Sequence, residues 1–171
     1  PVTSHGRDRS AGHVIDYVPS GAASVEIAPI SKPKRHFVFL LPPGLSMNAL
    51  SAAIDPLRIA NQLASQQLYS WDVLSADGVP VTCSNGLESG VQRAVGDIPK
   101  GSYVFVCSGV LPGRAAGAKA VTWVRNQWAK GCHVGGICTG AYTLARAGLL
   151  AGRRFTLHWE NIPGFVENFP D

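Results

Sequence analysis

Residues 132–148 read CHVGGICTGAYTLARAG, an apolar stretch that passes into a helical pattern around Cys138. Residues 132–137 have the length and composition of a buried strand. Residues 139–147 have the spacing of a helix, and Gly148 is a typical helix end. A buried strand that leads directly into a helix is the basic unit of a parallel sheet covered by helices. This stretch therefore predicts an α/β fold.

Two more buried strands are predicted on the N-terminal side of this unit. Residues 36–41 (HFVFLL) and 103–107 (YVFVC) are continuous apolar runs of strand length. Strands of this kind alternate along the chain with helical patterns, which is typical of a doubly wound sheet. We therefore expect a three-layer α/β sandwich with residues 36–41, 103–107 and 132–137 as its central strands.

Helices are predicted between these strands. Ser46 is suited to cap a helix that runs to about residue 66, in which Pro56 must cause a kink or a restart. A second helix is predicted over residues 115–130, ended by Gly131. The face of this second helix that we expect to pack on the sheet consists of Ala120, Val121, Val124 and Trp128.

Shorter elements complete the prediction. Residues 71–75 and 79–83 are split by Asp77-Gly78, a strong turn signal, so a β-hairpin is expected there. Residues 155–158 are predicted as a short strand and residues 161–169 as a helix.

The length of 171 residues, with 46% hydrophobic and 15% charged residues, is sufficient for one packed domain. Residues 1–35 lack periodic apolar spacing and are predicted to be a flexible N-terminal arm, with Val14, Ile15 and Tyr17 outside the core. The folded domain is then residues 36–171. No apolar run reaches the roughly 18 residues of a membrane helix, and no signal peptide is evident. We expect a cytoplasmic chain with no membrane partner.

The charge distribution and the cysteines argue against several classes of function. The net charge of +4 is divided evenly between residues 1–35 and the rest, so no basic stripe suited to direct DNA contact is present. Cys83, Cys107 and Cys132 are expected to be reduced thiols in the core. Cysteine spacing around His133 does not match a zinc site, so neither a metal nor another cofactor is expected.

The residues around Cys138 predict a nucleophile elbow. Gly136 and Gly140 lie two residues before and two residues after Cys138, where a strand turns into a helix. Glycines relieve the crowding of such a strained turn, and the adjoining helix N-terminus lowers a thiol pKa. The alternative is that Cys138 is a small core residue and the glycines only pack the helix on the strand.

His158 is the candidate partner of Cys138. It follows Cys138 by 20 residues and ends a predicted strand, so it is expected at the same edge of the sheet. Glu160 could orient its imidazole as a third member. Ser108 and Gly109 follow another strand and could offer backbone N–H groups to an oxyanion or a carboxylate. The alternatives are a structural histidine and an ordinary strand-to-loop break.

Longer stretches carry a resemblance to a known family. Residues 136–150 (GICTGAYTLARAGLL), 152–154 (GRR) and 158–160 (HWE) resemble the class I glutamine amidotransferase-like domain of the PfpI superfamily. This domain forms the N-terminal half of many AraC-family transcription regulators. Residues 44–47 (GLSM) and 53–61 (AIDPLRIAN) are similar to the branch whose regulators govern the use of arginine, carnitine or glycine betaine.

The resemblance covers about residues 36–171 and implies a flavodoxin-like sandwich. It implies a ligand-sensing domain that binds a small effector, forms a homodimer, and meets DNA only through a helix-turn-helix domain absent from these residues. It also implies a C-terminally truncated domain, since the family's last strand and helix are expected beyond Asp171.

The expected effector is a cationic or zwitterionic nitrogen metabolite from amino-acid or quaternary-amine metabolism. Its carboxylate is expected at the backbone N–H groups of Cys138 and Thr139, and its ammonium group against the ring of Trp159 or Tyr142. The residues expected to bind it are Cys138, Thr139, Ser108, Gly109, His158 and Trp159.

The resemblance also bears on catalysis. Enzymes of the superfamily place a carboxylate early in the first helix, and the matching residues here, 47–49, contain none. The catalytic pair Cys138 and His158 is then degenerate, and a sensor without catalysis is favoured. The alternative is a cysteine-dependent hydrolase or hydratase of the same superfamily.

Overall fold

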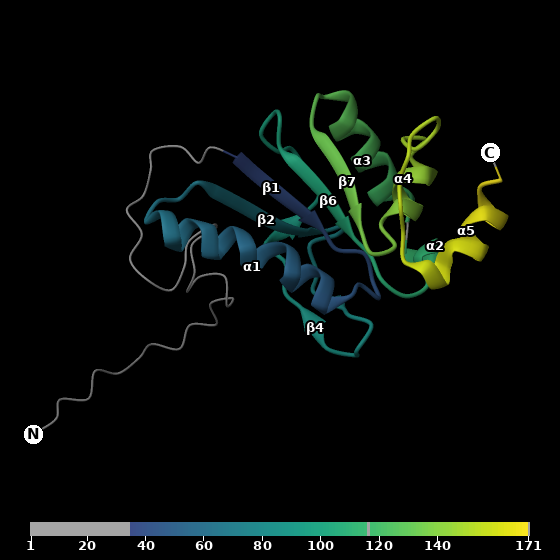
Figure 1. The fold of residues 1–171 in the computed structure, drawn as a ribbon, viewed down its shortest axis with the longest axis horizontal. Helices are drawn as coiled ribbons and strands as arrows, with labels where there is room; N and C mark the ends of the chain where they lie inside the picture. Colours follow the sequence, from purple (N-terminus) through teal and green to yellow (C-terminus); the bar gives the residue numbers. More distant parts are fainter. Residues whose placement is uncertain (1–34, 116, 171) are drawn as a thin grey trace, which may run out of the picture.

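The computed structural model describes residues 35–115 and 117–170 (Figure 1). The predicted N-terminal arm, with Val14, Ile15 and Tyr17, lies outside the described residues except for Arg35, which begins the first strand.

A five-stranded parallel sheet forms the centre of the fold, in the order β5-β2-β1-β6-β7. Its strands are β1 (Arg35–Leu40), β2 (Tyr69–Ser75), β5 (Arg93–Ala94), β6 (Tyr103–Cys107) and β7 (His133–Ile137). The three predicted buried strands are therefore confirmed as β1, β6 and β7. In the described part of the chain, however, β7 lies at the edge of the sheet and β2 in its interior.

One face of the sheet is covered by α1 (Met47–Ala64), as Figure 1 shows. The Ser46 hydroxyl caps this helix by accepting a hydrogen bond from the Ala49 N–H at 3.3 Å. Pro56 lies inside the helix without ending it. Pro56 and Ala52, whose carbonyl loses its intrahelical donor, are both exposed, so water can replace the missing bond. The helix contacts a core that includes Phe39, Trp71 and Val73.

The opposite face packs against α3 (Ala118–Ala129) and α4 (Ala141–Arg146), while α2 (Pro112–Ala115) is a single short turn. The helix predicted over residues 115–130 is confirmed as α3, although it begins later, at Ala118. Ala120 and Val124 of its predicted inner face are buried, whereas Trp128 is 46% exposed. Trp123 on the same helix is also buried. The Trp123 indole N–H donates to the Gly96 carbonyl at 2.7 Å, which gives its polar atom an acceptor inside the fold.

The predicted hairpin at Asp77-Gly78 is wrong. The turn exists, but the Ser75 hydroxyl closes it by accepting from the Gly78 N–H and donating to the Val79 carbonyl. Both edges of β2 are already used, by β1 and by β5. The following segment forms β3 (Val81–Thr82), which pairs with β4 (Glu88–Ser89) in a separate two-stranded sheet.

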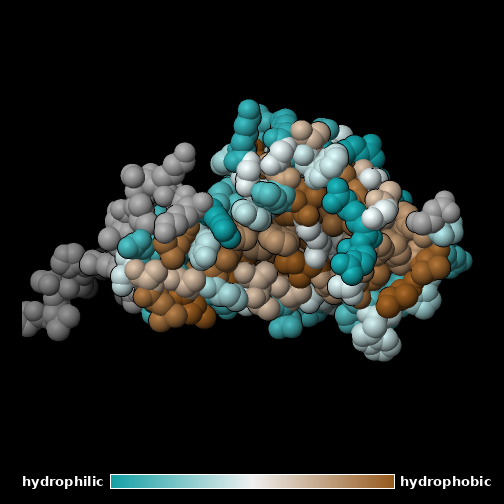
Figure 2. Space-filling view, turned by 45° about the horizontal axis from the view of Figure 1, so that its top comes forward, coloured by the Kyte–Doolittle hydropathy of each residue, from teal (hydrophilic) through white to brown (hydrophobic). Residues whose placement is uncertain are grey.

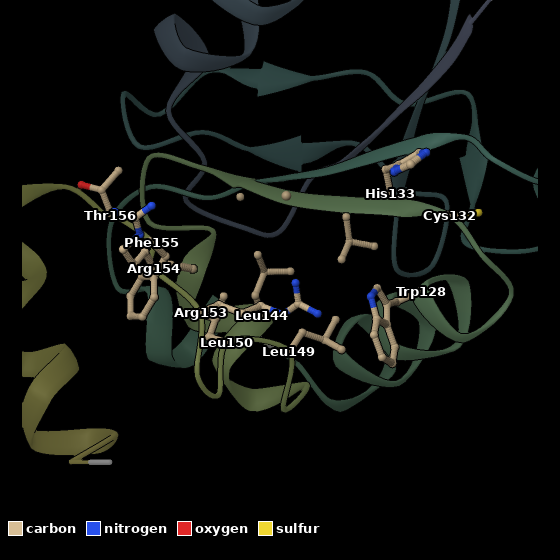
Figure 3. A pocket seen from close by; sticks show the side chains of 14 residues that line it. Trp128, Cys132, His133, Leu144, Leu149, Leu150, Arg153, Arg154, Phe155 and Thr156 are labelled. Carbon is tan, nitrogen blue, oxygen red and sulfur yellow. The ribbon is translucent and has the colours of Figure 1, made fainter.

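The strand predicted over residues 155–158 is absent. Residues 153–158 form no strand, and Phe155 and Thr156 line a cavity of about 470 Å³ that is also lined by residues of β7 (Figure 3). The helix predicted nearby is confirmed as α5 (Ile162–Asn168), which follows a single 3₁₀ turn (Trp159–Asn161). Phe165 of α5 packs edge-on against Tyr142 at 5.0 Å.

The surface carries exposed apolar side chains at the end of the molecule formed by α5. Ile162 and Val166 are one turn apart on this helix, and they are 46% and 58% exposed. Figure 2 shows hydrophobic surface at this end. Across the described residues, no helix combines the length and the apolar composition that crossing a bilayer requires.

Candidate functional site

Cys138 occupies a strained turn between β7 and α4. Its φ is +59°, in the left-handed region that residues other than glycine rarely adopt. The Gly140 N–H donates to the Ile137 carbonyl at 3.0 Å and closes the turn, and α4 begins one residue later. The strand-to-helix turn predicted at Cys138 is therefore present, with the expected backbone strain.

The two flanking glycines are required by close backbone approach. A Cβ atom on Gly136 would lie 2.7 Å from the Gly140 carbonyl carbon. A Cβ atom on Gly140 would collide with the Val106 carbonyl oxygen. Only glycine lets α4 start this close to the ends of β6 and β7.

A buried side-chain hydrogen bond joins the elbow to the loop after β6. The Thr139 hydroxyl donates to the Gly109 carbonyl at 2.6 Å, and Thr139 is only 1% exposed. Gly109 lies against the loop after β1, where any Cβ would collide with the Gly44 carbonyl oxygen. The Val110 N–H donates to that same Gly44 carbonyl at 3.0 Å. Three loops at the carboxyl edge of the sheet are thus held together around Cys138.

Two adjoining cavities, of about 470 and 350 Å³, open at this edge and share Ser46, Cys138 and His158. We call them together the elbow pocket. Its other lining residues are Asn48, Ala49, Gly136, Thr156 and Leu157 in the first cavity, and Ser84, Gly109, Val110, Leu111, Thr139, Glu160 and Asn161 in the second.

The structure brings Cys138 and His158 to the same pocket but does not pair them. Within the described part of the chain, the Cys138 sulfur has no hydrogen-bond partner. The His158 Nδ1 lies 3.7 Å from a Glu160 carboxylate oxygen, which is longer than a hydrogen bond. Their side chains are 43% and 64% exposed. Glu160 is therefore a weak, solvent-screened partner of a protonated His158 and does not fix its orientation by a hydrogen bond.

Two of the predicted ligand-binding residues are not among the lining residues of the pocket. Ser108 is 1% exposed, its N–H donates to Ile137 and its carbonyl accepts from Ser46. The Ser108 hydroxyl is buried and has no partner among the described residues. Trp159 is 71% exposed and lies outside the lining.

The aromatic contact expected for a ligand ammonium group is also not supported. The Tyr142 ring packs against Phe165 and Phe169. Burial above all raises the pKa of its hydroxyl, which donates to the Asn161 carbonyl. Among the residues that line the pocket, the acidic group is Glu160.

The sequence prediction missed the contribution of two earlier loops. Ser46, Asn48 and Ala49 belong to the start of α1, and Ser84 follows β3. Ligands bind outside the carboxyl ends of parallel strands. Ser46 lies in the segment that follows β1, so this rule could have indicated it as a pocket residue. Residues 47–49 contain no carboxylate, and two of them, Asn48 and Ala49, lie on the wall of the elbow pocket.

The other cysteines lie in the core, as predicted. Cys83, Cys107 and Cys132 are each at most 5% exposed. Burial raises the pKa of the Cys107 thiol to about 12 and also raises that of Cys83. Cys138 is the partly exposed thiol of the described chain.

Similarity to known proteins agrees with this fold. Residues 51–166 match the DJ-1/PfpI family. Over 136 residues the chain is 47% identical to the HTH-type transcriptional regulator CdhR of Pseudomonas aeruginosa, covering 80% of this chain and 40% of that protein. It is 37% identical over 144 residues to the HTH-type transcriptional regulator GbdR of the same species, covering 84% and 39%.

Among solved structures, an AraC family transcriptional regulator from Pseudomonas putida superposes with a TM-score of 0.65 at 26% identity. The superposition covers 80% of this chain and 73% of that one. The chain spans about two fifths of the length of the two HTH-type regulators. Its sequence and its flavodoxin-like parallel sheet show that the chain belongs to the DJ-1/PfpI family.

Proposed function

We propose that this chain is the metabolite-sensing and dimerisation part of an AraC-type transcription regulator, and that it binds its effector in the elbow pocket without turning it over. Its similarity to two HTH-type regulators supports this assignment. DNA contact belongs, in this proposal, to a helix-turn-helix domain outside these residues.

The observation that carries the proposal is the isolation of the thiol. A catalytic cysteine needs a base within hydrogen-bond reach, or a carboxylate that activates it. Among the described residues the Cys138 sulfur has no such partner, and α1 contributes Asn48 and Ala49 to the nearby wall. The elbow then serves to shape a pocket.

The chemistry of the lining suits a small zwitterion. In the loop after β6, the N–H groups of Ser108 and Val110 are hydrogen-bonded, whereas that of Gly109 has no acceptor among the described residues. We place the effector's carboxylate at this N–H group. Glu160 is the acidic lining residue, so we place the ammonium or quaternary amine end against its carboxylate. This role replaces the one expected for the rings of Trp159 and Tyr142.

Isothermal titration calorimetry with arginine, carnitine and glycine betaine tests this assignment. At least one of them is expected to bind, and Glu160→Gln is expected to weaken that binding about two- to fivefold, because it removes a solvent-exposed charge that faces the cation. Glu160→Asp retains the charge and should restore most of the affinity. Glu167→Gln, which removes an exposed charge on α5 outside the pocket, is the matched control and should bind normally. Equal affinity in Glu160→Gln would contradict the assigned role.

Dimerisation is tested separately by sedimentation velocity. The exposed apolar side chains Ile162 and Val166 on α5 support a contact between two copies of the chain. The chain is expected to sediment as a dimer at micromolar concentration. A monomer at all accessible concentrations would contradict this part of the proposal.

A further inference from the structure

A separate cavity of about 350 Å³ lies at the carboxyl ends of β1 and β2 and shares no lining residue with the elbow pocket. The segment after β1, the segment after β2 and the start of α3 line it. We call it the α3-side cavity. Its volume is within the range of small-molecule sites in proteins.

The interior of the α3-side cavity is apolar. Leu40, Leu41 and Ala120, each at most 5% exposed, contribute to its lining. Pro43 and Val79 also line it and are exposed, and the Val79 side chain is 54% exposed. An apolar group placed here would remove both the cavity lining and these exposed side chains from water, which favours binding.

The rim of the cavity carries two cations, Arg114 and Lys119. The rim also carries the carboxylate of Asp77, which accepts a hydrogen bond from the Val79 N–H at 3.2 Å. The Val79 N–H is the largest cause that lowers the Asp77 pKa, and the charge of Lys119 contributes a smaller part. The Arg114 guanidinium has no ion-pair or hydrogen-bond partner among the described residues. The rim therefore carries two cations against one carboxylate, a net charge of +1.

The α3-side cavity lies at the carboxyl edge of the parallel sheet, which is the edge where ligands of open α/β sheets bind. Residues from the loop after β1 and from the start of α3 line it.

We propose that the α3-side cavity binds a small monocarboxylate with a short apolar tail. The carboxylate lies between Arg114 and Lys119, and the tail lies against Leu40, Leu41 and Ala120. This site is independent of the effector site in the elbow pocket. A negative result at this cavity would therefore leave the proposed function of the elbow pocket unaffected, and the reverse also holds.

The experiment is a titration of the isotope-labelled 171-residue chain with 3-phenylpropanoate, followed by ¹H–¹⁵N NMR. Saturable shifts are expected at Ala76, Val79 and Ala120, which line or adjoin the cavity. The neutral isostere 3-phenylpropanamide is expected to bind at least about fivefold more weakly, because it lacks the charge. Equal affinity for the amide, an absence of shifts, or shifts centred on Thr139 and Gly140 of the elbow would each overturn the proposal.

Variants test the two cations. Arg114→Gln and Lys119→Gln are each expected to weaken binding of 3-phenylpropanoate about two- to fivefold, which is within the range for a partly exposed charge pair. Both residues are exposed, so the fold should tolerate these changes. Lys130→Gln removes a charge at the opposite end of α3 and should leave binding unchanged. An equal loss in Lys130→Gln would show that only the overall charge matters and would overturn the assigned site.

Discussion

The buried hydroxyl of Thr139 donates a 2.6 Å hydrogen bond to the carbonyl of Gly109. The two residues come from neighbouring strand ends: Thr139 follows β7 and Gly109 follows β6. This bond fixes the position of the elbow relative to the loop after β6. The shape of the elbow pocket therefore depends on one side chain that the pocket's ligand need not touch.

The first prediction concerns this bond. Thr139→Val keeps the shape of the side chain but leaves the Gly109 carbonyl unpaired, so the free energy of unfolding should fall by about 1–2 kcal/mol. Thr139→Ser retains the hydroxyl and should lose less. Urea unfolding followed by circular dichroism measures both. Equal stability of Thr139→Val and the unmodified chain would show that the bond contributes nothing.

The second prediction concerns the close approach at Gly140. Gly140→Ala forces a Cβ atom against the backbone of Val106 and of Ile137, and neither strand can move without disrupting the sheet. A loss of about 3 kcal/mol or more in unfolding free energy is expected. Gly90→Ala is the control, because a Cβ atom there meets nothing within 4 Å. Equal melting temperatures for Gly140→Ala and Gly90→Ala in thermal unfolding would contradict this account.

The third prediction concerns thiol reactivity. Iodoacetamide at pH 8 should alkylate Cys138, which is partly exposed, and spare Cys107. Burial raises the Cys107 pKa to about 12, so only about one thiol in ten thousand is ionised at pH 8. Mass spectrometry of the digested protein identifies the modified residues. In urea all four cysteines should react, and Cys107 reacting as fast as Cys138 in the folded chain would refute the burial argument.

The fourth prediction concerns pH. The His36 imidazole, whose Nε2 lies 3.6 Å from the Asp72 carboxylate, and next the hydrogen bond from Arg93 lower the pKa of Asp72, whose carboxylate lies 2.8 Å from the Arg93 guanidinium. A lowered carboxyl pKa means that the ionised group stabilises the fold at neutral pH, and that this contribution is lost as pH falls below about 3.8. Asp72→Asn should therefore cost about 1 kcal/mol at pH 7. The cost should shrink at pH 3.

Urea unfolding at both pH values checks this prediction. Asp97→Asn is the control, because Asp97 is 94% exposed and its pair with Lys130 is screened by water. A cost for Asp72→Asn that stays constant between pH 7 and pH 3 would contradict the assigned cause.

The buried strands were predictable because both of their faces are covered, which requires continuous apolar runs such as Phe37–Leu41. The hairpin at Asp77-Gly78 was not, because a local turn signal cannot show that β1 and β5 already occupy both edges of β2. Trp128 was assigned to the wrong environment for a similar reason, because helical spacing alone cannot show that the last turn of α3 extends beyond the core.

The site was predictable where one local pattern defines it. The glycines around Cys138 indicated the turn, and the end of β6 indicated Gly109. The opposite wall was not predictable, because Asn48 and Ser84 reach the pocket through the fold and carry no motif. Trp159 illustrates the reverse error: it adjoins His158 in sequence but lies outside the lining.

The central claim is that the elbow pocket binds a small zwitterion without Cys138-dependent chemistry. Calorimetric titration of the effector into the unmodified chain and into Cys138→Ser, with a parallel turnover assay on amide and nitrile substrates, tests it most directly. We predict that Cys138→Ser retains the affinity within about threefold and that neither protein turns over any substrate. Turnover by the unmodified chain that disappears in Cys138→Ser would contradict the account and assign the chain to the cysteine-dependent enzymes of its family.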